Sequence, residues 1–141
     1  MEGLSLGIEV ELQRALFTIL NAAKATLGVK GVYDVAPQSA DGGSAAAFPY
    51  VTVGSTVISA YDTTTDNGFE ATMRIHTFSR TGSMLECKTI QGKIYAALHN
   101  QPLSVVGFSN FLMLRTTTDC FSDQDGKAHG VCEYRALIET A

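Results

Sequence analysis

The 141-residue sequence has no long apolar run, no cluster of basic residues and only three cysteines. No stretch approaches the ~18 consecutive apolar residues of a membrane span, so we expect no contact with a membrane. No secretory pattern precedes the first basic residue, Arg14, which favours synthesis in the cytoplasm. Ten basic and fourteen acidic residues give a net charge of −4. Because a grip on DNA phosphates needs clustered Lys and Arg, this composition argues against a nucleic-acid-binding protein.

The sequence also lacks the motifs that mark catalytic and metal-binding sites. It contains no glycine-rich phosphate loop, no GxSxG serine motif and no HExxH zinc motif. Its three histidines, His76, His99 and His129, are too scattered to predict a metal site. His76 could be drawn together with Cys87 as a catalytic dyad, but a chain of this length offers such pairs by chance. We therefore expect a protein without enzyme activity, with no catalytic residue, metal or cofactor.

The three cysteines, Cys87, Cys120 and Cys132, are odd in number and lack metal-ligand spacing, which is typical of a reducing compartment. One alternative stays open. If a hairpin is centred near Gly126, Cys120 and Cys132 become near-opposite neighbours at a distance that a disulfide can span. We favour the reduced pair because of the expected compartment.

The stretch from Phe69 to Asn100 organises the chain. Its first part alternates, so one side of a strand carries Phe69, Ala71, Met73 and Ile75, and the other carries Glu70, Thr72, Arg74 and His76. Its second part has helical spacing, with an apolar stripe made by Met84, Cys87, Ile90, Ile94, Ala97 and Leu98. Ser83 and Glu86 have the spacing of a capping box, and Pro102 ends the helix. We expect this strand and this helix to bury each other's apolar sides and form the core.

The rest of the chain predicts one further helix and four further strands. The helix is indicated over Ile8–Leu27, with Gly28 as its C-cap. Short apolar runs predict strands at Val32–Val35, Phe48–Tyr61, Phe111–Phe121 and Val131–Glu139. An Asn-Gly turn makes residues 50–79 one long antiparallel hairpin, and a second hairpin turns at Asp123–Lys127. Pro37–Ala47 has no apolar period and is expected to be a loop.

These elements follow the order α-β-β-β-α-β-β, and no linker divides them. With a hydrophobic content of 45%, the sequence predicts a single α+β domain over residues 1–141. We expect a mainly antiparallel sheet built from two hairpins, with two helices packed on one face.

Two residues leave alternatives open. Gly92 lies inside the second predicted helix, either as a neutral surface glycine or as a point of close approach between helix and sheet. Phe78 falls on the polar side of its strand with Arg74 and His76. It is either an exposed aromatic side chain of a protein contact or is buried under another part of the fold.

A succession of short motifs resembles the tail-completion, or tail-terminator, family of long-tailed phages and phage-like gene-transfer particles. The motifs are Val32-Tyr33-Asp34, Pro37-Gln38, Phe48-Pro49-Tyr50-Val51, His76-Thr77-Phe78-Ser79-Arg80, Ala96-Ala97-Leu98-His99, Asp123-Gln124-Asp125-Gly126-Lys127-Ala128-His129-Gly130-Val131 and Tyr134-Arg135-Ala136-Leu137. They cover residues 8–139 in order. The departure is the loop at Ser39–Ala47, which is long for the family.

The resemblance implies a non-enzymatic virion protein that forms a ring, usually of six subunits, on the head-proximal end of the tail tube. Its partners are then the tail tube protein and the head-completion protein, and the ring both ends tube polymerisation and joins head to tail. A head-to-tail ring needs two different matching patches on each subunit. We expect Arg74, Phe78 and Arg80 to contribute to one patch. We expect the polar hairpin tip at Asp62, Asp66 and Asn67 to contact the tube or another neighbour.

A ring of such subunits has room for DNA. A compact chain of this length is roughly 37 Å across if spherical, and six touching spheres enclose a hole about one sphere wide. Duplex DNA would pass through without specific binding, and an acidic balance would avoid retarding it. The alternatives are a head-completion, connector or minor tail protein of the same particle and, from a different class, a small-ligand-binding module or enzyme.

Overall fold

The computed structural model describes residues 7–36, 46–60, 68–81, 83–109 and 111–139. Its helices are α1 (Ile8–Ala22), α2 (Lys24–Leu27) and α3 (Met84–Leu98). Its strands are β1 (Gly31–Tyr33), β2 (Tyr50–Ala60), β3 (Gly68–Thr81), β4 (Pro102–Leu103), β5 (Phe111–Leu112), β6 (Leu114–Ser122) and β7 (Lys127–Glu139). The predicted loop at 37–45 and the hairpin tip at 61–67 lie outside the described residues.

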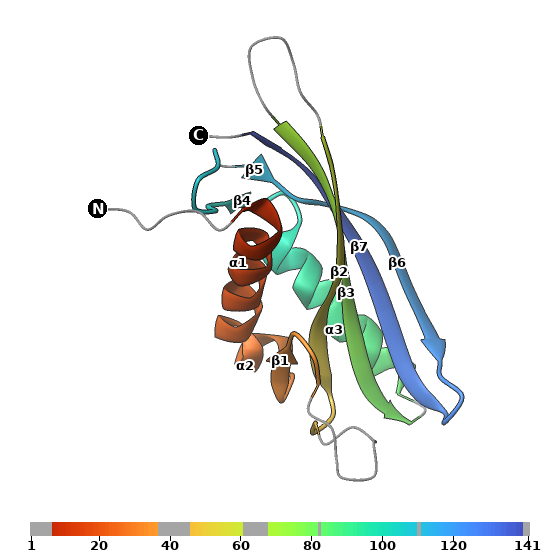
Figure 1. The fold of residues 1–141 in the computed structure, drawn as a ribbon. Coiled ribbons are helices and arrows are strands. Elements are labelled where there is room, and N and C mark those ends of the chain that lie inside the picture. The colour runs from red at the N-terminus through yellow and green to blue at the C-terminus, as the bar shows by residue number, and fades with distance from the viewer. Residues whose placement is uncertain (1–6, 37–45, 61–67, 82, 110, 140–141) are drawn as a thin grey trace.

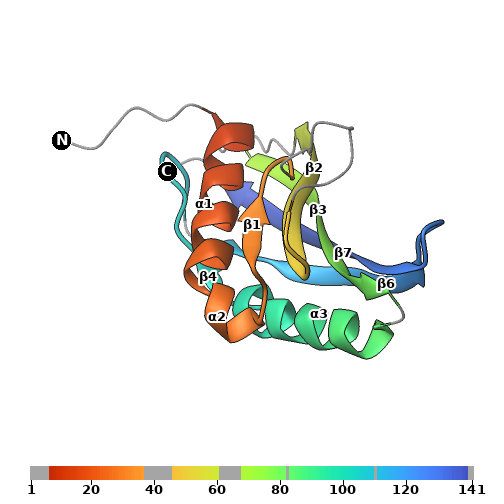
Figure 2. The same cartoon turned by 90° about the horizontal axis from the view of Figure 1, so that it is seen from below.

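Five strands form one twisted sheet in the order β1-β2-β3-β7-β6, and β4 pairs with β5 separately. Only the β1–β2 pair in the main sheet is parallel. Helices α1 and α3 lie on the same side of this sheet, while the described chain leaves the other face uncovered (Figures 1 and 2). The predicted α+β architecture, with a mainly antiparallel sheet and its helices on one face, is confirmed. We call the uncovered side the outer face.

Two long hairpins, β2–β3 and β6–β7, form most of the main sheet. Strands β2 and β3 pair from Tyr50–Phe78 to Ala60–Phe69, so the predicted antiparallel hairpin forms, with Gly68 of the Asn-Gly pair already in β3. The alternation along β3 is confirmed as well: Ala71, Met73 and Ile75 are fully buried against the helices. The polar side of the strand lies on the outer face, where Arg74 and Arg80 are exposed. Since β3 pairs along nearly its whole length on both sides, this register fixes where every outer-face side chain lies.

The first predicted helix is divided in two. Helix α1 buries Leu12, Leu16 and Leu20 in the core but ends at Ala22, and the short α2 follows after one residue. Gly28 closes α2 in the left-handed conformation, with φ of 78°, which confirms it as a C-cap. The strand expected at Val32–Val35 is found at Gly31–Tyr33.

Helix α3 begins and ends as expected, but its capping box is wrong. Ser83 makes no capping hydrogen bond through its side chain. Instead, the Glu86 carboxylate accepts a hydrogen bond from the Ser79 hydroxyl on the buried side of β3. A buried hydroxyl without a partner is costly, so Glu86 serves β3 instead of the helix end.

The predicted apolar stripe of α3 faces the core, where Cys87, Ile90, Ile94 and Leu98 are buried. Gly92 faces open space, because a Cβ built there has no atom within 4 Å. It is therefore the surface glycine of the two alternatives, and close approach of helix and sheet at this point was wrong.

The second hairpin forms, but its centre lies one residue before the expected one. Cys120 pairs with Gly130, and Thr118 pairs with Cys132. The predicted near-opposition of Cys120 and Cys132 is wrong by two residues, because moving a hairpin centre by one residue moves each cross-strand partner by two. All three cysteines are free thiols. Burial, and next the neighbouring Cys120 thiol, raise the pKa of Cys87, so this thiol stays protonated and unreactive near neutral pH.

Candidate assembly surface

The three predicted interface residues, Arg74, Phe78 and Arg80, share the outer face of β3. Each is an even step along the same strand, and the burial of the intervening residues shows that all three point away from the helices. They do not form a tight cluster, since Arg74 and Arg80 are six residues, or about 20 Å, apart along the strand. The surface is therefore an extended stripe.

Two ion pairs cross from β3 to β7 on this face. The Nε atom of Arg74 lies 3.5 Å from Glu133 Oε2, and the Nε atom of Arg135 lies 2.9 Å from Glu70 Oε1. Both arginines are more than half exposed. Exposed pairs of this kind contribute at most about 1 kcal/mol to folding. Their charges therefore stay available to a neighbouring protein.

Phe78 is not the free aromatic residue that its place on the polar side suggested. Its ring stacks on Tyr50 of β2, with 4.9 Å between centroids, and on His129 of β7, with 4.3 Å. Because β3 lies between these two strands, both faces of the Phe78 ring are covered and the side chain is half-buried. Of the two alternatives, burial holds for the ring faces, and only the edge remains for a protein contact.

Phe78 belongs to a larger group of rings on the outer face, which we call the aromatic cluster. The ring contacts join Tyr33, Phe48, Tyr50, His76, Phe78, Phe121 and His129. The Lys127 ammonium lies 4.8 Å from the centre of the Phe48 ring. Sequence reasoning missed this cluster because its members come from five separate segments. Only the strand register, which pairs residue 50 with 78, 78 with 129 and 129 with 121, brings most of them together.

Within the cluster, two histidines and a carboxylate form a continuous chain. His76 Nδ1 lies 2.9 Å from His129 Nε2. His129 Nδ1 lies 3.2 Å from Asp123 Oδ1. His76 packs against the backbone of Gly54, where a Cβ would come within 2.7 Å of its ring. Burial, then His129, then Arg74 lower the pKa of His76.

Arg80 lies at the end of the stripe. It is exposed, and its Nη2 is 3.5 Å from the carbonyl oxygen of Phe48, a weak contact at the limit of a hydrogen bond. The other predicted contact site, at Asp62, Asp66 and Asn67, lies outside the described residues. Arg80 is thus the described interface candidate whose side chain is least engaged in its own fold.

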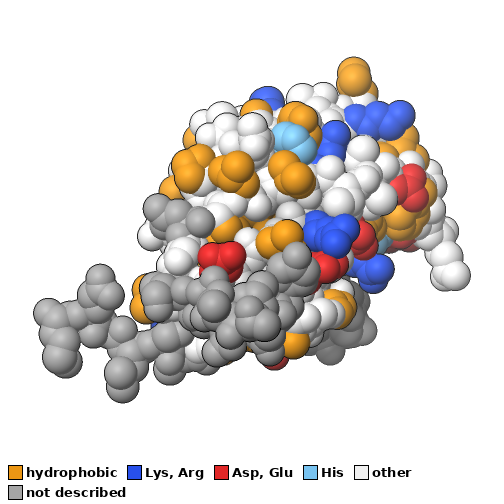
Figure 3. All heavy atoms as spheres, turned by 90° about the horizontal axis from the view of Figure 1, so that it is seen from above, with side chains coloured by type: hydrophobic (Ala, Val, Ile, Leu, Met, Phe, Trp, Pro, Cys, Tyr) orange, Lys and Arg blue, Asp and Glu red, His pale blue; other side chains and the backbone are white. Residues whose placement is uncertain are grey.

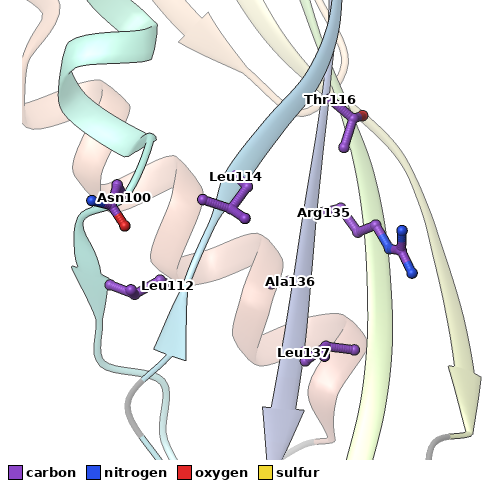
Figure 4. Close-up of a pocket in the computed structure, with 7 residues that line it drawn as sticks. All are labelled: Asn100, Leu112, Leu114, Thr116, Arg135, Ala136 and Leu137. Carbon is purple, nitrogen blue, oxygen red and sulfur yellow. The ribbon is translucent and has the colours of Figure 1, made fainter.

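An apolar concavity lies at the far end of the face, where β6 leaves β7. The β6–β7 ladder ends at Leu114–Arg135, whereas β7 continues along β3 to Glu139. The resulting hollow of about 490 Å³ is lined by Asn100, Leu112, Leu114, Thr116, Arg135, Ala136 and Leu137 (Figure 4). Leu112, Leu114 and Leu137 are each about half exposed. Seen from above, hydrophobic side chains lie among Lys and Arg and Asp and Glu side chains (Figure 3).

The described residues assemble no reactive constellation. His76 lies on the outer face, whereas Cys87 is fully buried on the helix side of the sheet, so the dyad considered from the sequence does not form. Among the described side chains, no group of three or more His, Cys, Asp or Glu could hold a metal ion. None of the described helices is long and apolar enough to cross a membrane. The outer face instead carries paired charges, the edge of the Phe78 ring and an apolar hollow.

The described residues thus form a small α+β domain with helices on one face of its sheet. The chain belongs to the family of tail completion protein gp17, whose model matches residues 14–139. The resemblance drawn from the sequence motifs is confirmed, and the protein is a structural component of a phage-like tail.

The fold itself is also found in a solved particle. A chain in the structure "Virion of native gene transfer agent (GTA) particle" superposes with a TM-score of 0.74 and 21% sequence identity. The match covers 96% of this chain and 99% of the other. No curated protein matches this sequence. The likeness shows that residues across nearly the whole chain adopt a fold that occurs in a virion.

Proposed function

We propose that this protein forms a ring, of six subunits, at the head-proximal end of the tail tube. The ring ends polymerisation of the tube and presents the surface to which the head-completion protein binds. The observation that carries the proposal is the family match over residues 14–139, which spans every strand of the main sheet. The described residues form a sheet with one face covered by helices and leave the other uncovered, which is compatible with lateral contacts between copies.

The ring contacts use the outer face. A head-to-tail ring joins two different patches, and the stripe of Arg74, Phe78 and Arg80 supplies part of one of them. The ion pairs of Arg74 and Arg135 give this patch charges that a neighbour can share, and such charges select the correct partner and register. The hairpin tip at Asp62, Asp66 and Asn67 reaches the tail tube or the head-completion protein.

The protein performs no catalysis in this role and needs no cofactor. DNA passes through the ring lumen without specific binding, since a net charge of −4 gives the subunit no general attraction for phosphates. The subunits assemble in the cytoplasm of the bacterial host and remain in the finished virion.

Particles produced without this protein test the proposed role. We expect electron microscopy to show tails of uncontrolled length, or finished tails that fail to join heads. Restoring the gene in trans should restore joined particles. If particles made without this protein had tails of normal length and normal infectivity, the proposed role would be refuted. Normal tails with a defect confined to the capsid portal would instead select a head-completion protein.

Arg80→Glu tests the interface stripe. The substitution reverses a charge that makes only a weak contact within its own subunit, so we expect unchanged secondary structure and melting temperature. In the interface, a like-charge contact costs several kcal/mol, so incorporation into tails should fall more than tenfold. Incorporation is measured by the amount of the protein in purified particles of a complemented deletion strain.

Lys93→Glu is the matched control, because it makes the same change of charge on the exposed side of α3, in the helix layer. Equal incorporation of the Arg80 variant and the wild type would exclude Arg80 from the interface. Equal loss in both variants would attribute the effect to net charge and not to the stripe.

A further inference from the structure

The chain of His76, His129 and Asp123 on the outer face joins three separate segments of the molecule. His76 comes from β3, His129 from β7, and Asp123 from the turn between β6 and β7. The two contacts, of 2.9 Å between the imidazole nitrogens and 3.2 Å to the carboxylate, lie within hydrogen-bond range. All three side chains are partly shielded from water. The arrangement therefore constrains how many protons it can hold.

We propose that these three residues form a proton-operated latch: the imidazoles hold together while they share a single proton across their contact, and a further proton separates them and uncovers Phe78.

The proton count follows from the geometry. An ionised carboxylate only accepts hydrogen bonds, so the Asp123 contact places a proton on His129 Nδ1. The contact between the two rings then needs one proton, either on His76 Nδ1 or on His129 Nε2. If both nitrogens carry a proton, two N–H groups face each other with no acceptor between them. His129 is then cationic, and a proton on the other nitrogen of His76 as well makes both rings cationic, so the contact becomes repulsive.

The neighbouring charges do not remove this repulsion. Titratable and charged groups that face the latch within the described chain are Tyr50 on β2, Arg74 and Arg80 on β3, Asp119 on β6, Asp123 and Asp125 in the turn, and Lys127 and Glu133 on β7. Glu133 is paired with Arg74, and Asp125 with Lys127. Asp123 contacts His129 and not His76, so its carboxylate does not reach the contact between the two rings. Burial, His129 and Arg74 accordingly lower the pKa of His76.

The latch holds more than its own rings. His129 stacks on Phe78 on one side and contacts Phe121 of the edge strand β6, with 4.8 Å between centroids. Asp123 also begins the tight turn, where its amide donates to the Lys127 carbonyl at 2.8 Å. Displacing His129 therefore exposes a face of Phe78 and loosens the end of the β6–β7 hairpin. Under the proposed function this end belongs to the subunit surface, so acid would alter assembly; that consequence alone rests on the proposed function.

The sign of the pH effect is fixed by the direction of the shift. The unfolded chain takes up its histidine protons near pH 6.5, whereas folded His76 resists protonation. Protons then favour the unfolded state, so stability is full above about pH 6.5 and falls as the pH is lowered through the folded transition. This loss adds to any general loss from carboxylates at lower pH.

Two measurements on the free, full-length protein test the latch. Nuclear magnetic resonance titration of the imidazole protons between pH 4.5 and 8 should show the pair taking up protons in two separate steps. The Phe78 ring signals should move with the second step. Chemical denaturation over the same range should show a falling midpoint below pH 6.5. Two histidines that titrate independently, with Phe78 signals unchanged, would overturn the proposal.

The variant His76→Gln sharpens the test, because its amide can still donate to His129 Nε2 but cannot become charged. We expect one step of proton uptake at His129 and no loss of the denaturation midpoint between pH 6.5 and 5.5. The control His99→Gln removes a histidine from outside the latch, where His99 Nδ1 accepts from the Arg115 amide, and should keep the acid-sensitive loss. The same pH dependence in His76→Gln and wild type would refute the latch. Failure of ring assembly at every pH would contradict the ring and leave these readouts unchanged.

Discussion

Replacing Tyr134 with alanine should lower the free energy of unfolding by about 3–5 kcal/mol, the usual cost of removing a buried aromatic ring. Tyr134 is the largest of the fully buried side chains that the structure describes, and it lies near the middle of β7. Its backbone pairs with Met73 on one side and Arg115 on the other. Loss of the ring would leave a cavity between sheet and helices that no neighbouring side chain can fill without moving a strand. Chemical denaturation of the purified variant measures the change.

Tyr134→Phe is the matched control, since it removes only the hydroxyl group. That buried oxygen has no hydrogen-bond partner of ordinary geometry among the described residues, and only the nearby Arg115 guanidinium interacts with it, so its removal should cost little. We expect this variant to stay within about 1 kcal/mol of the wild type. A loss in the phenylalanine variant as large as in the alanine variant would mean that the hydroxyl, and not the packing of the ring, stabilises the sheet.

Under the proposed function, the stability of this sheet matters because the contacts between subunits depend on the shape of each subunit. Natural domains are stable by only about 5–15 kcal/mol, so a loss of 3–5 consumes a large part of the total. The outer face has little core of its own and takes its geometry from the strands beneath it. A variant that loosens β7 would therefore be expected to lose assembly together with stability. Arg80 makes only a weak contact with the Phe48 carbonyl, whereas Phe78 is stacked between two rings. Substituting Arg80 therefore tests the interface with less effect on folding than substituting Phe78.

Much of the fold could be predicted because local patterns and tertiary packing agree. The alternation along 69–76 matches one buried and one open face, and the helical stripe of 84–98 matches the groove above that sheet. The turn residues between two alternating runs predicted the first hairpin but not its register. The last pair is Ala60–Phe69, whereas a two-residue Asn67-Gly68 turn would pair Asp66 with Phe69. The resemblance to tail completion proteins rested on those same segments, and the family match bears it out.

The predictions that were wrong or missing concern residues with two possible partners, or the register and pairing of strands. Glu86 had the spacing to cap α3, but its carboxylate accepts a hydrogen bond from the buried Ser79 hydroxyl instead. No local sequence pattern predicts this contact, because the two residues are seven positions apart and lie on different elements. The second hairpin turn contains several residues that favour turns, so its centre was misplaced by one and the Cys120–Cys132 opposition failed. The parallel pairing of β1 with β2 has no signal of its own in so short a strand.

The candidate surface was only partly predictable for a related reason. The sequence placed Arg74, Phe78 and Arg80 on one side of a strand, and that placement holds. It could not show that Tyr50 and His129 cover the Phe78 ring, because this requires the register of both neighbouring strands. The histidine chain was missed in the same way: His76 and His129 are 53 residues apart and share no motif.

Gly130→Ala should lower the free energy of unfolding by about 2–4 kcal/mol. Gly130 lies on the buried side of β7, directly behind the latch, and faces the helix α3. A Cβ there would come within 2.3 Å of the Gln91 amide nitrogen and 2.8 Å of the Cys87 sulfur. Adding a methyl group to a filled site costs about 1–3 kcal/mol. Moving Gln91 would also break its 2.8 Å hydrogen bond to the Asp119 carbonyl, at a cost of about 1 kcal/mol.

Gly92→Ala is the matched control for Gly130→Ala, because the same chemical change is expected to raise the free energy of unfolding and not to lower it. This glycine lies on the exposed side of α3 with open space around it, where alanine should stabilise the helix by up to about 1 kcal/mol. Both variants are compared with the wild type by chemical denaturation. A neutral Gly130→Ala would mean that Gln91 leaves its site without cost and does not hold β6 against the helix. The expected loss would identify Gly130 as the residue whose lack of a side chain lets Gln91 and Cys87 fill the space between β7 and α3.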